Sequence, residues 1–331
     1  MWSKSKAIAA LLSCALIFGP RYAIAIGSAK TLAVVNSGGD TLVLVDVDHG
    51  NITRTVAVRT HPQDVVVSPD GKVAYVAEMG TMEEPGHTIA VVKLDSKEVE
   101  RRLELGKFGL PHLLKLSRNG ETLWAACAPQ QAVVEVNTQT GKVERGWDTG
   151  QAGSYMFAVT RDEAKIYVAN FDTGTLSVIR RTDNSTKMIA WSGQPIGIDI
   201  SPDGKEVWVA NFKTNEIAIV NTEDDKIAEV FSSGGDGPGR LKFTRDGKRV
   251  LVTFSHSNEV AAYDARRRKL LWKTATGHFP KGLFIDPDGG RAYVSMMEDG
   301  EVVAFDLDGK EKGRFASGKE PEGLAMFETS R

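Results

Sequence analysis

Cysteine is scarce in this sequence. Of its 331 residues only Cys14 and Cys127 are cysteines, and Cys14 lies in an N-terminal segment that we expect to be removed. A single remaining thiol cannot form an internal disulfide, so packing and hydrogen bonds must hold the fold together. Cys127 falls at the end of an expected strand, where we expect an inert, partly buried thiol.

Long apolar runs are missing except near the N-terminus. Residues 1–25 combine two lysines, an apolar run over residues 7–18 and a small-x-small site that ends at Ala25, which is the pattern of a secretory signal. No later stretch reaches the length of about eighteen apolar residues that a membrane helix needs. We therefore expect a periplasmic or extracellular mature chain that has no transmembrane segment and begins near Ile26.

A second interpretation of the N-terminus is a lipoprotein signal. Leu11-Leu12-Ser13-Cys14 resembles a lipobox, in which Cys14 would carry the lipid. This interpretation is disfavoured because half of the apolar segment, residues 15–18, would be left behind the cut.

Positive charge is not in excess. The chain has 41 lysine and arginine residues against 43 aspartate and glutamate residues. The densest basic run, Arg266-Arg267-Arg268-Lys269, falls in an expected turn between strands. Nucleic-acid-binding proteins show a basic stripe or face, so no nucleic-acid partner is expected.

Contiguous catalytic and cofactor motifs are missing as well. The sequence has no G-x-S-x-G elbow, no phosphate-binding loop, no C-x-x-C-H haem motif and no EF-hand pattern. A site must therefore be assembled from separate parts of the chain.

What the sequence does contain is a repeat. The turn Ser68-Pro69-Asp70-Gly71 recurs as SRNG at 117, TRDE at 160, SPDG at 201, TRDG at 244 and DPDG at 286. The spacings are 49, 43, 41, 43 and 42 residues. Each unit has an apolar run, the turn, a strand such as KVAYVAE or KEVWVAN, and two further strands. A period of this length with four strands predicts propeller blades.

The two ends of the chain supply one further unit. Residues 31–36 (TLAVVN) form a second strand that lacks a first, and residues 321–327 (PEGLAMF) form a first strand that lacks the rest. Pairing them closes the ring and removes the exposed edges of an open array. The prediction is an all-β, seven-bladed propeller of four-stranded antiparallel blades over residues 26–331, which we expect to be a monomer.

The repeat resembles a known family. Tyr75-Val76-Ala77, Tyr167-Val168-Ala169-Asn170 and Trp208-Val209-Ala210-Asn211 are similar to the YVTN-type repeats of YncE-like bacterial propellers. The resemblance covers about residues 30–327 and extends distantly to the haem d1 propeller of periplasmic nitrite reductase and to seven-bladed lactonases. It implies the fold, whereas its members include binding proteins, cofactor carriers and enzymes.

One face of such a ring carries the loops that enter the inner strands, around the mouth of the channel. A column of prolines, with Ser154 in place of one of them, marks this face. The candidate ligand-binding residues beside it are His61, Asp64, His112, Tyr155, Arg240, His278, Lys281 and Glu322. We expect the same face to include residues after the second strands: Asn36, Glu78, Cys127, Asn170, Asn211, Phe254, His256 and Met296.

Four of the six histidines fall on this face: His61, His112, His256 and His278. Imidazoles around a channel suit a divalent metal, a general base or an axial haem ligand. No contiguous H-x-x-x-H spacing is present, so a metal site would draw on different blades. The alternative is that these histidines are hydrogen-bonding loop residues.

One loop on this face is longer than the others. The segment from Glu78 to Thr88 exceeds its equivalent in another unit by about five residues and carries Met79, Met82 and His87. A loop of this kind could fold over the mouth as a lid or hold a partner.

The sequence leads to two main functional hypotheses and to a third one that ranks below them. The favoured hypothesis is a binding or accessory protein that presents its channel mouth to a small molecule, cofactor or protein partner without turnover. The alternative is a lactonase-like hydrolase or a lyase that uses a metal or a histidine pair at the same mouth. The third is a haem carrier similar to the haem d1 propellers.

Overall fold

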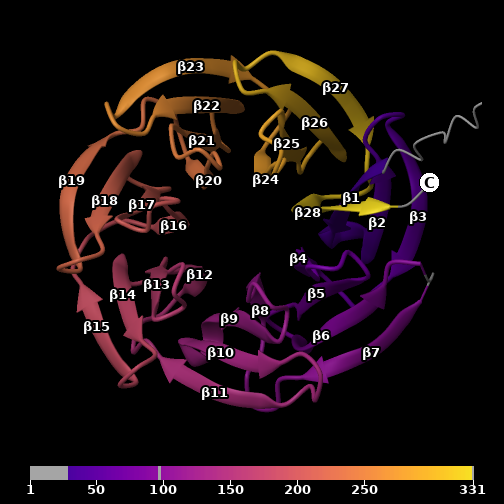
Figure 1. Ribbon diagram of the computed structural model, residues 1–331, viewed down its shortest axis with the longest axis horizontal. Helices are drawn as coiled ribbons and strands as arrows, with labels where there is room; N and C mark the ends of the chain where they lie inside the picture. The colour runs from indigo at the N-terminus through magenta and orange to yellow at the C-terminus, as the bar shows by residue number, and fades with distance from the viewer. Residues whose placement is uncertain (1–28, 96–97, 330–331) are drawn as a thin grey trace, which may run out of the picture.

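The structure is a computed structural model that describes residues 29–95 and 98–329. The predicted signal sequence and Cys14 of the alternative lipobox interpretation lie outside these residues. In the described part of the chain the strands form seven four-stranded antiparallel sheets arranged in a ring (Figure 1). The predicted fold is therefore confirmed.

Each blade runs from an inner strand beside the channel to an outer strand at the rim. Blade 1 consists of β28 (Pro321–Thr329), β1 (Ala29–Asn36), β2 (Thr41–Asp46) and β3 (Asn51–Ala57). Blade 2 consists of β4 (Pro62–Val67), β5 (Val73–Gly80), β6 (Pro85–Lys93) and β7 (Val99–Glu104). Blade 3 consists of β8 (Pro111–Leu116), β9 (Thr122–Cys127), β10 (Ala132–Asn137) and β11 (Val143–Asp148).

The other four blades continue in the same order. Blade 4 consists of β12 (Ser154–Val159), β13 (Lys165–Asn170), β14 (Thr175–Arg180) and β15 (Ser185–Ile189). Blade 5 consists of β16 (Pro195–Ile200), β17 (Glu206–Asn211), β18 (Glu216–Asn221) and β19 (Lys226–Ser232). Blade 6 consists of β20 (Pro238–Phe243), β21 (Arg249–Phe254), β22 (Glu259–Asp264) and β23 (Lys269–Ala275). Blade 7 consists of β24 (Pro280–Ile285), β25 (Arg291–Met296), β26 (Glu301–Asp306) and β27 (Glu311–Ala316). Two short 3₁₀ turns, η1 (Ser37–Gly39) and η2 (Ala128–Gln130), follow second strands.

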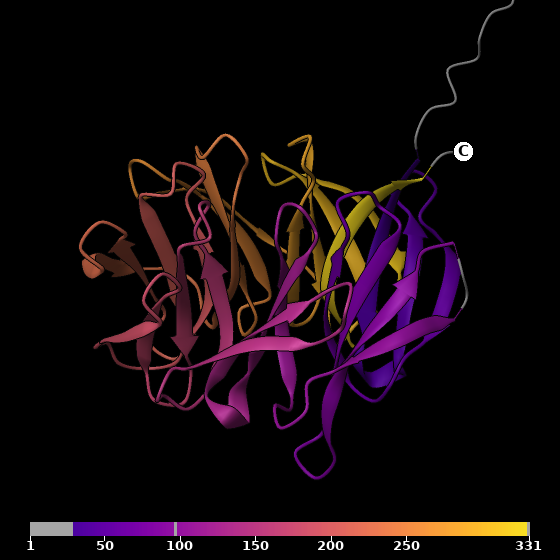
Figure 2. The same ribbon diagram turned by 60° about the horizontal axis from the view of Figure 1, so that its bottom comes forward.

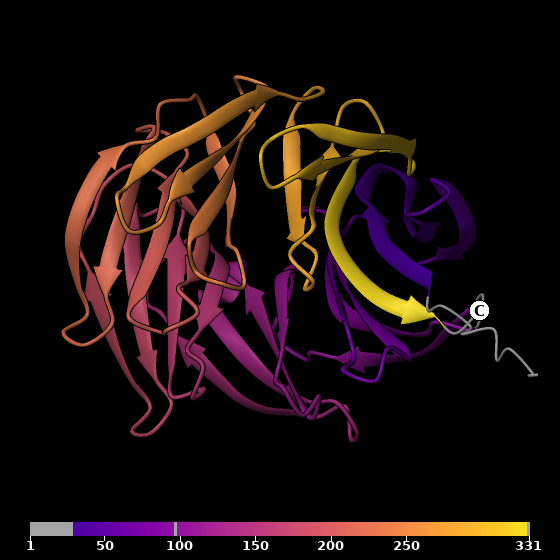
Figure 3. The same ribbon diagram turned by 45° about the horizontal axis from the view of Figure 1, so that its top comes forward.

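The two ends of the chain close the ring. The yellow β28 lies antiparallel beside the indigo β1 (Figure 3), with Thr31 opposite Phe327. Lys30 of β1 also forms ion pairs with Asp286 at 2.7 Å and Asp288 at 2.5 Å in the turn of blade 7. Burial alone would lower the pKa of Lys30, but its hydrogen bonds with these carboxylates raise it to about 12. Strand pairing and charge therefore both hold the joint.

The core lies between adjacent blades. The second and third strands are covered on both faces, so their side chains are buried at successive positions, as in β17 and β18. The outer strands are mostly exposed, as in β19. The repeated turns close through their own side chains, since the hydroxyl of Ser68 donates to Asp70 at 2.6 Å and that of Thr244 to Asp246 at 2.7 Å. Among the described residues, no helix has the length and apolar character needed to cross a membrane.

Candidate functional site

All seven inner strands carry an irregularity directly after their first residue. In β4, for example, Pro62 is opposite Glu78, but the next paired residue is Val65, and the other six inner strands shift at the same place. A bulge of this kind redirects side chains at the end of a strand. As a result two successive residues, such as Tyr155 and Met156, reach the same cavity.

His61 stands just before such a strand, in the left-handed backbone region. Its φ is 59°, and Leu110, Phe279 and Glu320 have similar values before their own prolines. The N–H of His61 donates to the carboxylate of Asp40 at 2.8 Å. This residue therefore occupies a backbone position that the repeat itself requires.

A cavity of about 310 Å³ opens at the mouth. Its lining residues come from blades 3 to 7: His112, Tyr155, Met156, Phe171, Ile196, Phe212, Gly239, Arg240, Ser255, Phe279 and Lys281. Four of these were candidate ligand-binding residues from the sequence: His112, Tyr155, Arg240 and Lys281. The cavity is thus the place where the fold assembles half of that set.

Aromatic rings follow one another around this cavity, and we call them the aromatic arc. In order, they are His112, Tyr155, Phe171, Phe212, His256 and Phe279. Successive ring centroids lie 5.2, 6.1, 6.4, 4.6 and 6.3 Å apart, in tilted or edge-on orientation. The three phenylalanines are only partly buried. Large apolar side chains gathered at one opening are typical of a binding surface.

Charged residues form the base of the mouth. Glu322 is buried and accepts a hydrogen bond from Lys281, and Asp64 accepts one from the N–H of Leu114 at 2.9 Å. Burial raises the pKa of both carboxyls, against the opposing charges of Lys281 and Arg240. The Arg240 guanidinium itself has no hydrogen bond or ion pair to any described residue. It is therefore available to a ligand.

His112 is held neutral at the edge of the arc. Its Nδ1 atom is buried and has no hydrogen-bond partner among the described residues. Burial, and then the charges of Arg240 and Lys281, lower its pKa well below the usual value. An uncharged imidazole with a spare nitrogen can accept or donate a proton.

Two other predicted histidines have partners that are not histidines. His278 is exposed and pairs through Nδ1 with Asp299 at 2.7 Å, which raises its pKa. His256 stands edge-on to Phe212 in the arc. Across residues 29–95 and 98–329, no three histidine, cysteine, aspartate or glutamate side chains lie close enough to hold a metal ion. The four histidines proposed as metal ligands, His61, His112, His256 and His278, thus do not form a three-ligand centre.

The ends of the second strands do not line the mouth, which corrects the expectation from the sequence. The seven residues opposite the first residue of each inner strand are completely buried: Asn36, Glu78, Cys127, Asn170, Asn211, Phe254 and Met296. Two of these side chains fix the loop that enters their blade, because Asn211 accepts a hydrogen bond from the N–H of Gln194 at 2.8 Å and Glu78 accepts one from the N–H of Arg59 at 2.9 Å. Cys127 is fully buried, and burial raises the pKa of its thiol to about 12.

The long loop of blade 2 is not a lid in this structure. It continues β5 and β6 as a hairpin, with Gly80 opposite Pro85, and projects from one face of the ring (Figure 2). Its tip residue Met82 is 76% exposed, and His87 is held by the carbonyl of Phe108 at 2.9 Å. No residue of this hairpin lines the mouth cavity.

Sequence reasoning missed three members of the arc. Phe171 and Phe212 directly follow the buried residues Asn170 and Asn211, and Phe279 directly precedes Pro280. A signal was present, because the dipeptide Asn-Phe occurs at the same position of two neighbouring units. The repeat comparison identified Asn170 and Asn211, whereas the ring at the mouth belongs to the residue that follows each of them.

Fold and mouth together define a seven-bladed propeller with a cavity at one end of its ring. The chain belongs to the YncE-like β-propeller family, because the sequence model of that family matches residues 149–324. No curated protein matches the sequence.

Several solved structures share the fold. Hydrazine synthase of Kuenenia stuttgartiensis is 20% identical, with 84% of this chain and 92% of that chain covered and a TM-score of 0.74. A functionally unknown protein from Desulfotomaculum acetoxidans DSM 771 is 14% identical, with coverage of 89% and 98% and a TM-score of 0.76. A candidate 6-phosphogluconolactonase from Bacteroides fragilis NCTC 9343 is 14% identical, with coverage of 92% and 99% and a TM-score of 0.73. At such identities the likeness concerns the fold alone.

Proposed function

We propose that the protein binds a flat, largely apolar small molecule with one anionic group in the mouth cavity. The observation that carries this proposal is the aromatic arc beside the unpaired guanidinium of Arg240. Aromatic side chains contact flat ligands by stacking and edge-on packing. An arginine fork matches a carboxylate, sulfonate or phosphate.

The size of the cavity supports the same conclusion. Its volume of about 310 Å³ is at the lower end of the range for small-molecule sites. Lys281 is already engaged by Glu322, so Arg240 is the anchor for the anionic group. Haem is also flat, but it has two carboxylates and is larger than this ligand class, so it is tested as a separate ligand.

The direct test is binding of 2-naphthoate, a flat aromatic carboxylate, by calorimetry. We expect a dissociation constant of about 1 mM or tighter, in line with ligand efficiency for a molecule of this size. The neutral analogue 2-naphthamide and the variant Arg240→Gln should each weaken binding at least about tenfold, because both remove the charge-assisted pair. Titration with haem, followed by visible absorbance, tests the larger ligand.

A matched pair of double variants tests whether the ligand binds in the mouth cavity. Phe171→Leu with Phe212→Leu keeps apolar volume but removes two rings of the arc, and we expect weaker binding. Phe108→Leu with Phe231→Leu makes the same change at residues that do not line the mouth cavity and should leave binding unchanged. Equal affinity of 2-naphthoate for both double variants, or no difference between naphthoate and naphthamide, would refute the proposal.

A hydrolase is the second candidate, and His112 favours it. A neutral imidazole with an unpartnered Nδ1 next to Arg240 could remove a proton from water while the guanidinium stabilises an oxyanion. The aromatic lactone dihydrocoumarin is a suitable probe. Hydrolysis that is lost in His112→Ala while 2-naphthoate still binds would support this candidate, and absence of hydrolysis would leave the binding protein.

We also propose that the protein works outside the cytoplasm. The support is the signal pattern of residues 1–25. N-terminal sequencing of protein recovered from the host's extracytoplasmic fraction should begin at Ile26. An intact N-terminus in the cytoplasmic fraction, or a lipid on Cys14, would contradict the proposed processing.

A further inference from the structure

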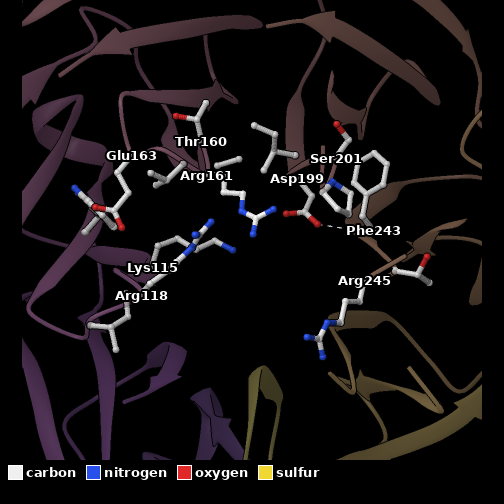
Figure 4. A pocket seen from close by; sticks show the side chains of 16 residues that line it. Lys115, Arg118, Thr160, Arg161, Glu163, Asp199, Ser201, Phe243 and Arg245 are labelled. Carbon is white, nitrogen blue, oxygen red and sulfur yellow. Dashed lines mark hydrogen bonds between the residues drawn. The ribbon is translucent and has the colours of Figure 1, made fainter. Parts of the chain in front are cut away.

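The opposite end of the ring, where the repeated turns lie, holds a cavity of about 680 Å³ (Figure 4). Four basic side chains line it, Lys115, Arg118, Arg161 and Arg245, against two acidic ones, Glu163 and Asp199. In Figure 4 the nitrogen ends of Lys115, Arg118 and Arg161 gather toward the centre of the cavity, and Arg245 borders it. The chain as a whole has a net charge of −2, so this concentration of positive charge is local.

The fold does not require these arginines. Arg118, Arg161 and Arg245 occupy the second position of the repeated turn, where three other units have proline. Proline is the residue that turn chemistry favours there. The turn bond is kept without it, since Thr160 still donates to Asp162 at 2.6 Å. The arginines therefore replace a structurally suitable residue with a charged one.

None of the three guanidinium groups forms an ion pair with a described carboxylate, although the charge of Arg245, after that of Lys30, lowers the pKa of Asp288. Within the described residues Arg118 and Arg161 form no hydrogen bond or ion pair, and Arg245 reaches only the carbonyl of Pro287 at 3.4 Å. By contrast, Arg102 pairs with Glu78 at 2.9 Å and Arg181 with Glu135 at 2.8 Å elsewhere in the ring. The guanidinium donors of Arg118 and Arg161 are thus unoccupied.

Two lysines extend the positive charge into the ring. Lys115 on β8 and Lys242 on β20 both line the central cavity of about 420 Å³ that adjoins this end. The Lys242 charge, and then burial, lower the pKa of Lys115 to about 7, against the opposing charges of Asp199 and Asp64. Asp199 lies 3.5 Å from Lys242. Asp199 is thus paired with Lys242, whereas Lys115 has no ion pair among the described residues, and a bound anion would stabilise its charged form.

We propose that this end of the ring is a second binding site, for a small oxyanion with two or more negative charges, held by Arg118, Arg161, Arg245 and Lys115. The chemical class covers inorganic phosphate, pyrophosphate, sulfate and polycarboxylates. Arginine forks bind such groups through paired, charge-assisted hydrogen bonds. The site lies at the turn end of the ring and is independent of the ligand proposed for the mouth.

Sulfate is the first probe because it stays a dianion across neutral pH. We expect saturable binding by calorimetry at low ionic strength, where screening is weak. The inner triple variant, Arg118→Gln with Arg161→Gln and Arg245→Gln, should bind at least about tenfold more weakly. The control variant Arg145→Gln, Arg266→Gln, Arg267→Gln changes the net charge equally on exposed positions and should lose less than about twofold.

The pH dependence provides a second readout. The charged groups in the two cavities that Lys115 lines are Lys242, Asp199, Asp64, Arg118, Arg161, Glu163, Arg240 and Arg245. Bound sulfate favours the protonated amine, so affinity should fall as the pH rises above the lowered pKa of Lys115. The variant Lys115→Met should lose this dependence while its arginines still bind sulfate.

Three outcomes overturn the proposal. The first is that sulfate, pyrophosphate and citrate all show no saturable binding. The second is that the two triple variants lose the same amount of affinity. The third is that Arg240→Gln loses sulfate binding while the inner triple variant keeps it. Tighter binding of pyrophosphate or of citrate than of sulfate, lost in the inner triple variant, supports the site and identifies the preferred type of anion. Circular dichroism and melting curves of each variant establish that all of them are folded.

Discussion

At the scale of the single residue, neighbours decide what a side chain can do. His112 and His278 come from the same face of the repeat alignment, yet their pKa values move in opposite directions. Burial and nearby cations keep His112 neutral, whereas Asp299 favours the charged form of His278. The sequence identified both as candidates, but it could not show these neighbours, because they come from other blades or from loops about twenty residues away in the chain.

This difference can be measured by NMR titration of the imidazole rings. We expect the pKa of His278 to lie above the ordinary value for histidine. We expect the pKa of His112 to lie well below that value, so that its ring is neutral at neutral pH. Asp299→Asn should lower the pKa of His278 and leave that of His112 unchanged. Titration of both rings at the same pH would contradict the arrangement described for the mouth.

One buried carboxylate ties two blades together. Asp225 of blade 5 accepts hydrogen bonds from Lys165 at 2.8 Å and Tyr167 at 2.5 Å of blade 4, and also pairs with Arg180. Burial alone would raise its pKa, but these hydrogen bonds lower it. Because the folded pKa is lowered, the stabilisation is present above the unfolded pKa and disappears as the pH falls through the folded one.

Asp225→Asn should therefore lower the free energy of unfolding by about 3–5 kcal/mol at neutral pH, because it leaves two cations without their partner. Asp224→Asn, at the exposed neighbour, should change it by less than about 0.5 kcal/mol. Urea unfolding measures both. The difference between wild type and Asp225→Asn should shrink as the pH falls below about 4; a difference that does not depend on pH would contradict the role of the charge.

At the scale of the element, the repeat made strands and turns predictable. Turn residues and strand patterns recur at fixed spacing, so the order of strands and the joint between β28 and β1 followed from the sequence. The direction of side chains at strand ends did not. In each blade, one residue of the second strand lies opposite the leading residue of the inner strand, as Cys127 is opposite Pro111. Its side chain is buried inside the ring and does not reach the mouth. The bulge next to it shifts the register of the inner strand, so the residues that reach the mouth differ from those that regular alternation predicts.

The hairpin of blade 2 supplies an element that can be changed separately. Replacing residues 81–84 with Asn-Gly provides a two-residue turn that antiparallel strands accept. We expect unchanged affinity for 2-naphthoate and a melting temperature within about 2 °C of wild type, because the tip packs on nothing at the mouth. A marked change in affinity would show that the hairpin closes over the ligand.

At the scale of the whole molecule, the ring depends on its two ends. Ending the chain at Lys319 removes β28 and leaves β1 as an open edge strand, which invites pairing between molecules. We expect loss of the single cooperative melting transition and formation of soluble oligomers, measured by calorimetry and light scattering. The shortened hairpin is the control, since it removes residues without opening an edge. A monomeric truncated chain with the wild-type melting curve would contradict closure by β28.

The whole molecule also explains why the basic end was not found from the sequence. No basic stripe exists along the chain, because Arg118, Arg161 and Arg245 lie in separate repeats. The ring brings them to one opening. Arg240 lines both the mouth and the central cavity, and Lys115 lines the central cavity and the turn-side cavity. The ring therefore has an aromatic opening at one end and a cationic one at the other.

The binding of a flat anion at the mouth is tested most directly by a crystal of the protein soaked with 6-bromo-2-naphthoate. The anomalous signal of bromine locates the ligand without assumption about its pose. We expect a peak in the mouth cavity, with the ring against Phe171 and Phe212 and the carboxylate on Arg240. Bromine found only outside this cavity, or a carboxylate turned away from Arg240, would contradict the proposed function.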